Sequence, residues 1–96
     1  MEIEQVVLAH FQYIERVAAF LEGSGPEPEP SSPEECAMGQ WLRENPNPAM
    51  VEPHNRFHAI LAEAVAKKKA GAESEAKALL DQAYTIYSQL EHALFQ

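Results

Sequence analysis

Apolar side chains recur along residues 3–22 with the spacing of an α-helix. They stand three, four or seven positions apart, at Ile3, Val7, Ile14, Val17 and Leu21, with Val6, Tyr13 and Phe20 beside them. Positions with these separations share one face of a helix, so the pattern predicts a helix about 30 Å long with one face turned to a core. His10 falls on the same face, between Val7 and Ile14.

A loop and a second, short helix are predicted to follow. Residues 23–32 are rich in Gly, Pro and Glu, a composition that favours neither helix nor strand. Ser32, Pro33 and Glu35 then match the start of a helix, as the N-cap, the first helical position and the closing residue of a capping box. This short helix is predicted to end near residues 43–48 and to carry Cys36, Met38, Gly39, Trp41 and Leu42.

Two longer helices complete the pattern. The third is predicted from about Val51 to Lys69, with Pro53 in its first turn and one face formed by Val51, His54, His58, Leu61 and Val65. Gly71 lies where a C-terminal glycine is expected, and a fourth helix opens near Glu73, with a stripe of Leu79, Ala83, Ile86, Leu90 and Leu94. Because no alternating strand pattern and no internal repeat is present, residues 1–96 are predicted to form a single all-α domain. Its architecture is an antiparallel four-helix bundle whose second helix is short.

Charge and composition restrict the functions that this bundle can have. Lys and Arg total 7 against 15 Asp and Glu, a formal net charge of -8. This balance argues against binding to nucleic acids or to anionic membrane surfaces, because both need a basic patch. No apolar stretch approaches the roughly 18–20 residues that span a bilayer, and the N-terminus lacks the basic region of a signal peptide. The expected location is the cytoplasm, where a single cysteine stays reduced.

Two histidines four positions apart suggest a metal site in the core. His54 and His58 stand one turn apart on the face that Leu61 continues, and side chains so placed can reach a common ion. Alone, such a pair is more often coincidental or a hydrogen-bonded surface pair. His10 and the sole cysteine, Cys36, change the balance, because three inward histidines and one thiol match the donors of a tetrahedral zinc site. The fourth histidine, His92, lies on a polar face.

The sequence around Cys36, "CAMGQWL", resembles the chemoreceptor zinc-binding (CZB) domain family. The resemblance extends over nearly the whole chain and rests on "AHFQY", "CAMGQW" and "HNRFH", that is, on His10, Cys36, Gly39, Trp41, His54, Phe57 and His58. It implies that His10, Cys36, His54 and His58 are ligands of a Zn²⁺ ion in the bundle core. Two departures from the family pattern occur. Met38 replaces a leucine, and Tyr13 and Ile14 stand where a tryptophan and a basic residue are usual.

The resemblance also implies a function. CZB domains are regulatory parts of bacterial chemoreceptors and diguanylate cyclases, associated with sensing zinc and hypochlorous acid, and they commonly form homodimers. Cys36 is then expected to be redox-reactive, because a zinc-bound thiolate is the form that oxidants attack. Gly39 is expected to let another helix approach the site closely, and Trp41 and Phe57 to pack around it. With no output segment in this chain, a signalling protein of the chemoreceptor or cyclase type is the expected partner.

Other functions remain open at this point. Four protein ligands leave no coordination position for a reacting water, so an enzyme is not expected. A structural zinc-bound interaction module, or a zinc buffer, would use the same four residues. A di-iron bundle like hemerythrin needs bridging carboxylates, but Ile14 and Ala62 stand one turn after His10 and His58.

Overall fold

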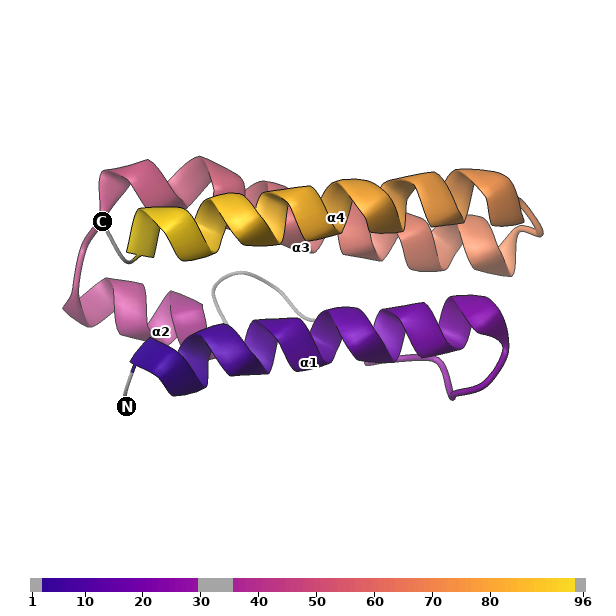
Figure 1. Ribbon diagram of the computed structural model, residues 1–96, viewed down its shortest axis with the longest axis horizontal. Helices are drawn as coiled ribbons and strands as arrows, with labels where there is room; N and C mark the ends of the chain where they lie inside the picture. Colours follow the sequence, from indigo (N-terminus) through magenta and orange to yellow (C-terminus); the bar gives the residue numbers. More distant parts are fainter. Residues whose placement is uncertain (1–2, 30–35, 95–96) are drawn as a thin grey trace.

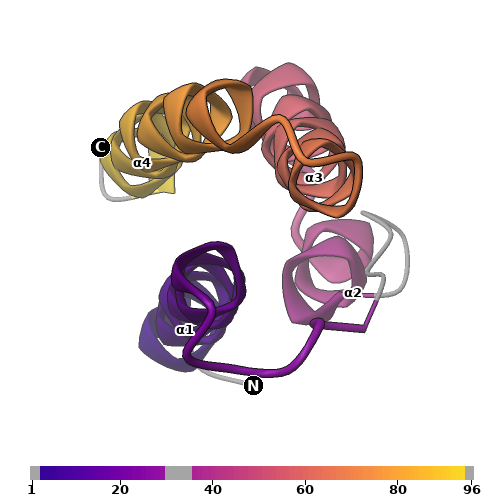
Figure 2. The ribbon, with the colours of Figure 1, turned by 90° about the vertical axis from the view of Figure 1, so that its right-hand side faces the viewer.

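Four helices make up the described part of the chain. The computed structural model describes residues 3–29 and 36–94, which form α1 (Ile3–Glu22), α2 (Ala37–Glu44), α3 (Pro48–Lys69) and α4 (Glu73–Leu94). Successive helices alternate in direction along a molecule of 39 × 20 × 18 Å (Figure 1), and these two ranges contain no strand. Seen end-on, the helices surround a common core, with α2 between α1 and α3 (Figure 2). The prediction of an all-α four-helix bundle with a short second helix is confirmed.

α1 turns its predicted apolar face to the core. Ile14 and Val17 are fully buried, and so is Val6, which the spacing had placed at the flank of the stripe. After α1 the chain reverses at Gly23, whose φ of +79° suits a residue without a Cβ. Residues 23–29 are irregular, as predicted, whereas residues 30–32 of the expected loop lie outside the described ranges.

Two contacts hold the segment 25–29 against the bundle. The Tyr13 hydroxyl on α1 donates a hydrogen bond of 3.0 Å to the Glu29 carbonyl. The Lys69 ammonium at the end of α3 lies 3.0 Å from the Glu27 carboxylate. The segment after α1 therefore contacts both α1 and α3 before the chain reaches Cys36.

α2 begins later than the sequence indicated. Its first residue is Ala37 and its N-cap is Cys36, so the cysteine precedes the helix and is not carried inside it. The predicted start at Ser32, Pro33 and Glu35 lies outside the described residues. Among the described helices, the backbone of α2 packs closely against α1 alone.

α3 begins earlier than predicted, at Pro48. The Ala49 N–H donates to the side-chain oxygen of the N-cap Asn47 at 3.2 Å, and Pro48 occupies the first turn, where a missing N–H costs nothing. Val51 was predicted on the buried face but is 54% exposed, whereas Met50 is fully buried. Met50 takes that place because it lies four residues before His54 and seven before Phe57, in line with both.

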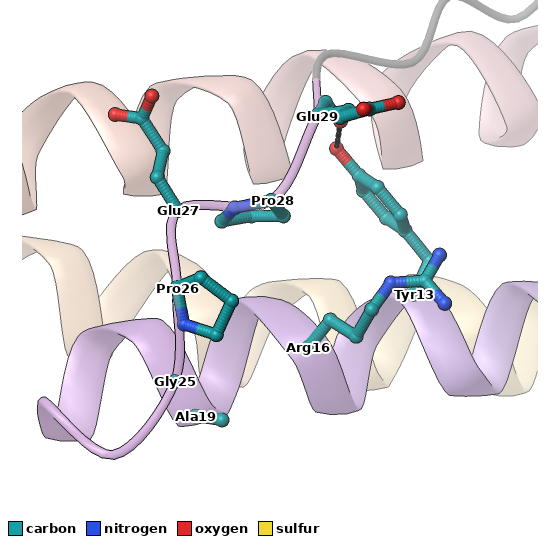
Figure 3. Close-up of a pocket in the computed structure, with 8 residues that line it drawn as sticks. All are labelled: Tyr13, Arg16, Ala19, Gly25, Pro26, Glu27, Pro28 and Glu29. Atoms are coloured by element: carbon teal, nitrogen blue, oxygen red, sulfur yellow. Dashed lines mark hydrogen bonds between the residues drawn. The ribbon is translucent and has the colours of Figure 1, made fainter.

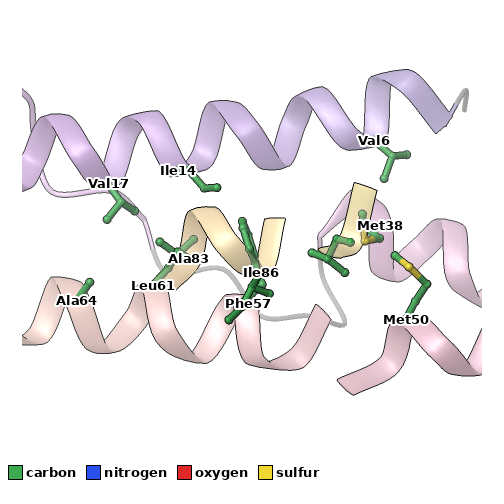
Figure 4. Close-up of a cluster of buried hydrophobic side chains, with 11 residues drawn as sticks. Val6, Ile14, Val17, Met38, Met50, Phe57, Leu61, Ala64, Ala83 and Ile86 are labelled. Atoms are coloured by element: carbon green, nitrogen blue, oxygen red, sulfur yellow. The ribbon is translucent and has the colours of Figure 1, made fainter. Parts of the chain in front are cut away.

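α3 and α4 form an antiparallel hairpin that makes the broadest interface of the bundle. Gly71, with a φ of +85°, closes the turn as predicted, and α4 buries Ala83, Ile86 and Leu90 of its predicted stripe. Figure 4 shows the core running between the helices, with Val17 at one end and Met38 at the other. None of the described helices combines the length and apolarity needed to cross a bilayer.

Candidate metal centre

Four side chains from three parts of the chain meet in the core. His10 comes from α1, Cys36 from the residue before α2, and His54 and His58 from successive turns of α3. One donor atom from each lies within 4.8 Å of all the others. The structure thus brings together the four residues that the sequence singled out. His92 is exposed on α4, away from this cluster.

The spacing of the donor atoms fits a tetrahedral ion. With Zn–S near 2.3 Å and Zn–N near 2.0–2.1 Å, a tetrahedron separates sulfur and nitrogen ligands by about 3.6 Å. The Cys36 Sγ lies 3.5 Å from His10 Nε2 and 3.1 Å from His54 Nε2. For these atoms to share one tetrahedral ion, the separation between Cys36 Sγ and His54 Nε2 must lengthen by about 0.5 Å, and the widest donor separation of the cluster, up to 4.8 Å, must shorten. Three imidazoles and one thiolate are also donors that zinc prefers.

Hydrogen bonding prepares the His10 ring to act as a ligand. Its Nδ1 lies 2.9 Å from the Val6 carbonyl oxygen. Because a carbonyl can only accept, Nδ1 carries the proton and Nε2, which faces Cys36, keeps its lone pair. Such a bond on the far nitrogen fixes the tautomer and orientation of a metal-binding histidine.

Burial favours the neutral form of the His10 and His54 imidazoles, which is the form that binds metal. His10, His54 and His58 are each at most 5% exposed. The pKa of His54 is lowered from 6.5 to about 4, mainly by burial and also by the neighbouring His58 and His10. Burial is also the main cause of the lowered pKa of His10, opposed by its bond to Val6. At neutral pH His10 and His54 are therefore neutral imidazoles, each with one ring nitrogen free of a proton.

Cys36 differs from the three histidines in its surroundings. It is partly exposed, and its Sγ accepts a 3.3 Å hydrogen bond from the Gly39 N–H in the first turn of α2. A sulfur in an N-cap position faces the positive end of the helix, which favours the thiolate. The sequence had suggested Gly39 only as a site of close helix approach. The close approach of a helix at Gly39 stays a prediction. The hydrogen bond from the Gly39 N–H to the Cys36 sulfur was not predicted from the sequence.

Aromatic side chains pack around the cluster. Phe57 is fully buried, and its ring centroid lies 5.3 Å from that of His10 and 5.5 Å from that of His58. Trp41 is half-buried and packs against the core from α2. Both lie where the sequence analysis expected packing residues.

The cluster opens toward solvent on the side of α1. A pocket of about 140 Å³ is lined by His10, Cys36 and His58 together with Ala9, Tyr13, Arg16 and Phe57. The sequence analysis did not single out Arg16, although it lies three residues after Tyr13, along the same side of α1.

The donor set does not suit a di-iron centre. Within the described ranges, the group that could hold a metal consists of three histidines and a cysteine and contains no carboxylate. A bridged pair of irons needs carboxylates between them.

Comparisons with known proteins agree with this chemistry. The model of the family described as the chemoreceptor zinc-binding domain (CZB) matches residues 10–65, more than half of the chain. The matched range includes His10, Cys36, His54 and His58. Neither the curated proteins nor the solved structures give a match.

Proposed function

Because the chain belongs to the chemoreceptor zinc-binding domain family and gathers three histidines and one cysteine in its core, we propose that it is a regulatory zinc-binding domain. Its signal is zinc, or an oxidant such as hypochlorous acid, acting at Cys36 in the bacterial cytoplasm. The observation that carries this proposal is the contrast within the cluster. Cys36 is partly exposed and capped by a short helix, whereas the histidines are buried on long helices.

The helix packing supports a switch at α2. His54 and His58 belong to α3, but among the described helices the backbone of α2 packs closely against α1 alone. An ion held by Cys36 and the histidines would link the start of α2 to α3, a connection that helix packing supplies weakly. Zinc, when bound, supplies a positive charge that keeps the thiolate deprotonated and draws the four side chains together.

Oxidation of Cys36 removes one donor from this set. In the net reaction with hypochlorous acid, RS⁻ + HOCl → RSOH + Cl⁻, sulfur gives up an electron pair, an S–O bond forms and the O–Cl bond breaks. Chloride leaves with the electron pair, and the sulfenic acid keeps the proton. The neutral sulfenic acid is a poorer metal ligand than the thiolate, so the link between α2 and α3 weakens.

We propose a regulatory and not a catalytic role for this site. Four protein donors fill a tetrahedral shell, which leaves no coordination position for an attacking water. The output is then passed to a signalling protein of the chemoreceptor or diguanylate cyclase type. A purely structural zinc module and a zinc buffer are the alternatives that the test below separates from a sensor.

Native mass spectrometry of the full chain, before and after a stoichiometric dose of hypochlorous acid, tests the proposal. We expect one zinc per chain, lost as Cys36 gains one oxygen and regained after thiol reduction and zinc addition. Because Met38 and Trp41 also react with this oxidant, peptide mapping must place the oxygen on Cys36. His92→Ala is the matched control for the histidine ligands and should bind zinc as the native chain does.

Each alternative predicts a different experimental result. Zinc that is retained after Cys36 is oxidised would leave only a structural module. Zinc that exchanges freely without any change in the hydrogen exchange of α2 would indicate a buffer. Cys36→Ser with undiminished zinc affinity and an undiminished response to oxidant would remove the basis for a thiolate switch.

We further propose that two copies pair through the outer surface of α1 and α4. Leu8 is 53% exposed there, beside an apolar groove of about 460 Å³ rimmed by Glu4 and Glu91. Lys77 stands 14 residues before Glu91, on nearly the same side of α4. In an antiparallel pair, Glu91 of one copy would therefore approach Lys77 of the partner subunit. Sedimentation of a monomer at micromolar concentration would refute this pairing.

A further inference from the structure

The pocket beside the metal centre determines the side from which a small reagent can reach Cys36. Cys36, Tyr13 and Arg16 line this pocket, and Arg16 contributes a guanidinium group. The other lining residues are Ala9, His10, Phe57 and His58. The histidines are almost fully buried, whereas Cys36 is partly exposed. Reagents that reach the sulfur from this side pass Arg16 and Tyr13. A volume of about 140 Å³ holds a few water-sized molecules and excludes a peptide.

Arg16 is held in position at this pocket. Its guanidinium carbon lies 5.5 Å from the centre of the Tyr13 ring, within the range of a cation–π contact. Tyr13 is itself fixed by its bond to the Glu29 carbonyl, and Figure 3 shows Arg16, Tyr13 and Glu29 around the adjoining groove. Arg16 and Tyr13 line both this groove and the smaller pocket, so they stand where the two meet.

Arg16 takes part in no ion pair within the part of the chain that the structure describes. Among the described residues, no carboxylate lies within ion-pair distance of it, and the nearby Glu27 is paired with Lys69. On α1 itself the residues three or four positions away from Arg16 are uncharged. Glu27 and Glu29 line the adjoining groove. Among the described residues that line the smaller pocket with Cys36, however, none has a carboxylate and Arg16 supplies a guanidinium cation.

We propose that Arg16 makes Cys36 selectively reactive toward small anionic electrophiles, such as the hypochlorite and peroxynitrite anions, relative to neutral reagents of similar size. The inference rests on the proposed function of Cys36 as the oxidant-sensing residue and names the chemical class that it meets. For hypochlorite the balanced step is RS⁻ + OCl⁻ + H₂O → RSOH + Cl⁻ + OH⁻. An S–O bond forms, the O–Cl bond breaks, chloride leaves with the electron pair and water supplies the proton. Arg16 attracts the incoming anion and faces the chloride that departs.

Alkylation of Cys36 tests the selectivity without any oxidant. Iodoacetate and iodoacetamide react alike, with an S–C bond formed and iodide released, but only iodoacetate carries a charge. Because the chain has one cysteine, the mass of the intact protein reports the rate directly. Rates are measured for the full chain, metal-free and zinc-loaded, in the native protein, Arg16→Gln, Arg16→Lys and the control Arg56→Gln. Arg56 is exposed on α3 and does not line the pocket.

The measured quantity is the ratio of the iodoacetate rate to the iodoacetamide rate. One unit charge several ångströms from the sulfur in a water-like dielectric corresponds to a roughly threefold change in this ratio. We expect Arg16→Gln to lower it by about that factor at low salt, Arg16→Lys and Arg56→Gln to keep it, and molar salt to remove the difference.

Two results would overturn the proposal. One is an unchanged ratio in Arg16→Gln; if both rates change there by the same factor, Arg16 acts only by shaping the pocket. The other is an equal fall of the ratio in Arg56→Gln. Circular dichroism of each variant checks that the fold is kept. Loss of the selectivity alone would leave zinc release on oxidation intact, and the native mass spectrum reports that release separately.

Discussion

A buried residue that is not itself a metal donor is expected to influence the zinc affinity. Met38 lies on α2 and is 1% exposed, so its side chain is one of the contacts that hold α2 against the core. Truncation of a buried methionine to alanine costs about 2–5 kcal/mol. Because α2 has only eight residues and lies at one end of the bundle, where neighbours can relax, we take about 2–3 kcal/mol as the docking energy lost in Met38→Ala.

This loss should appear as weaker zinc binding. Cys36 can join the histidines only when α2 is docked, so the apparent affinity falls with the docked fraction of the metal-free chain. With about 1.4 kcal/mol for each factor of ten, the loss is at most about 30- to 150-fold, and it is smaller by the factor with which the docked form outweighs the undocked form in the native metal-free chain. Competition with a chromophoric chelator at neutral pH measures it. Met38→Leu conserves volume and should bind zinc almost as tightly as the native chain.

The control is a core truncation far from α2. Val17 is fully buried at the opposite end of the core from Met38, as Figure 4 shows. Val17→Ala should lower the stability of the whole fold and leave the zinc affinity of the folded chain nearly unchanged. The reasoning would be refuted if Met38→Ala bound zinc like the native chain, or if Val17→Ala weakened binding as much.

Acidification, loss of a helix cap and a charge on the outer surface each have an expected outcome. The pKa of His54 is lowered from 6.5 to about 4, so below pH 6.5 the unfolded chain takes up protons that the folded metal-free chain does not. Its free energy of unfolding should fall by about 1–2 kcal/mol between pH 7 and 5, and by less in His54→Gln. Urea denaturation measures this fall, and a rise on acidification would contradict it. Asn47→Ala removes the acceptor for the Ala49 N–H and should cost about 1 kcal/mol in thermal denaturation, with Asn47→Asp close to the native value. Leu8→Glu should convert the proposed dimer to a folded monomer in sedimentation, and an unaltered dimer would argue for another surface.

The metal cluster could be predicted because helix periodicity fixes the direction of a side chain. His10 lies in line with Val7 and Ile14, and His54 and His58 lie in line with Leu61. Once each stripe faced a common core, the rings had to meet there. Cys36 carries no periodicity of its own. It was included because it is the sole thiol, and the resemblance of the motif around it to the CZB family supported that choice.

The start of α3 could not be placed from apolar spacing alone. Met50 and Val51 are both apolar neighbours, and either can begin a stripe through His54. What decides between them is the register to Phe57 and the Asn47 cap, which lets the helix begin at Pro48. Pro48 lies in the first turn of α3, where its missing N–H is harmless.

The role of Arg16 depends on contacts that no local pattern contains. From the sequence alone, Arg16 cannot be distinguished from any other exposed residue of a helix. Its place beside the metal centre follows from Tyr13, and Tyr13 in turn is fixed by a bond to Glu29 across a chain reversal. Interactions between a helix and an irregular segment have no sequence period by which they could be recognised.

The two contacts that hold the segment 25–29 against the bundle, one from Tyr13 and one from Lys69, also limit how far Cys36 can move. Cys36 follows Glu29 by seven positions, a tether of at most about 25 Å when fully extended, and α2 is joined to α3 by a turn of only three residues, 45–47. Because both connections are short, the Cys36 thiol meets the three histidines at an effective concentration in the millimolar range. Recapture of Cys36 after reduction is thus intramolecular, and its rate should be independent of the concentration of the protein. Recovery from an oxidative pulse would then be governed by the supply of reductant and zinc, and not by reassembly of the fold.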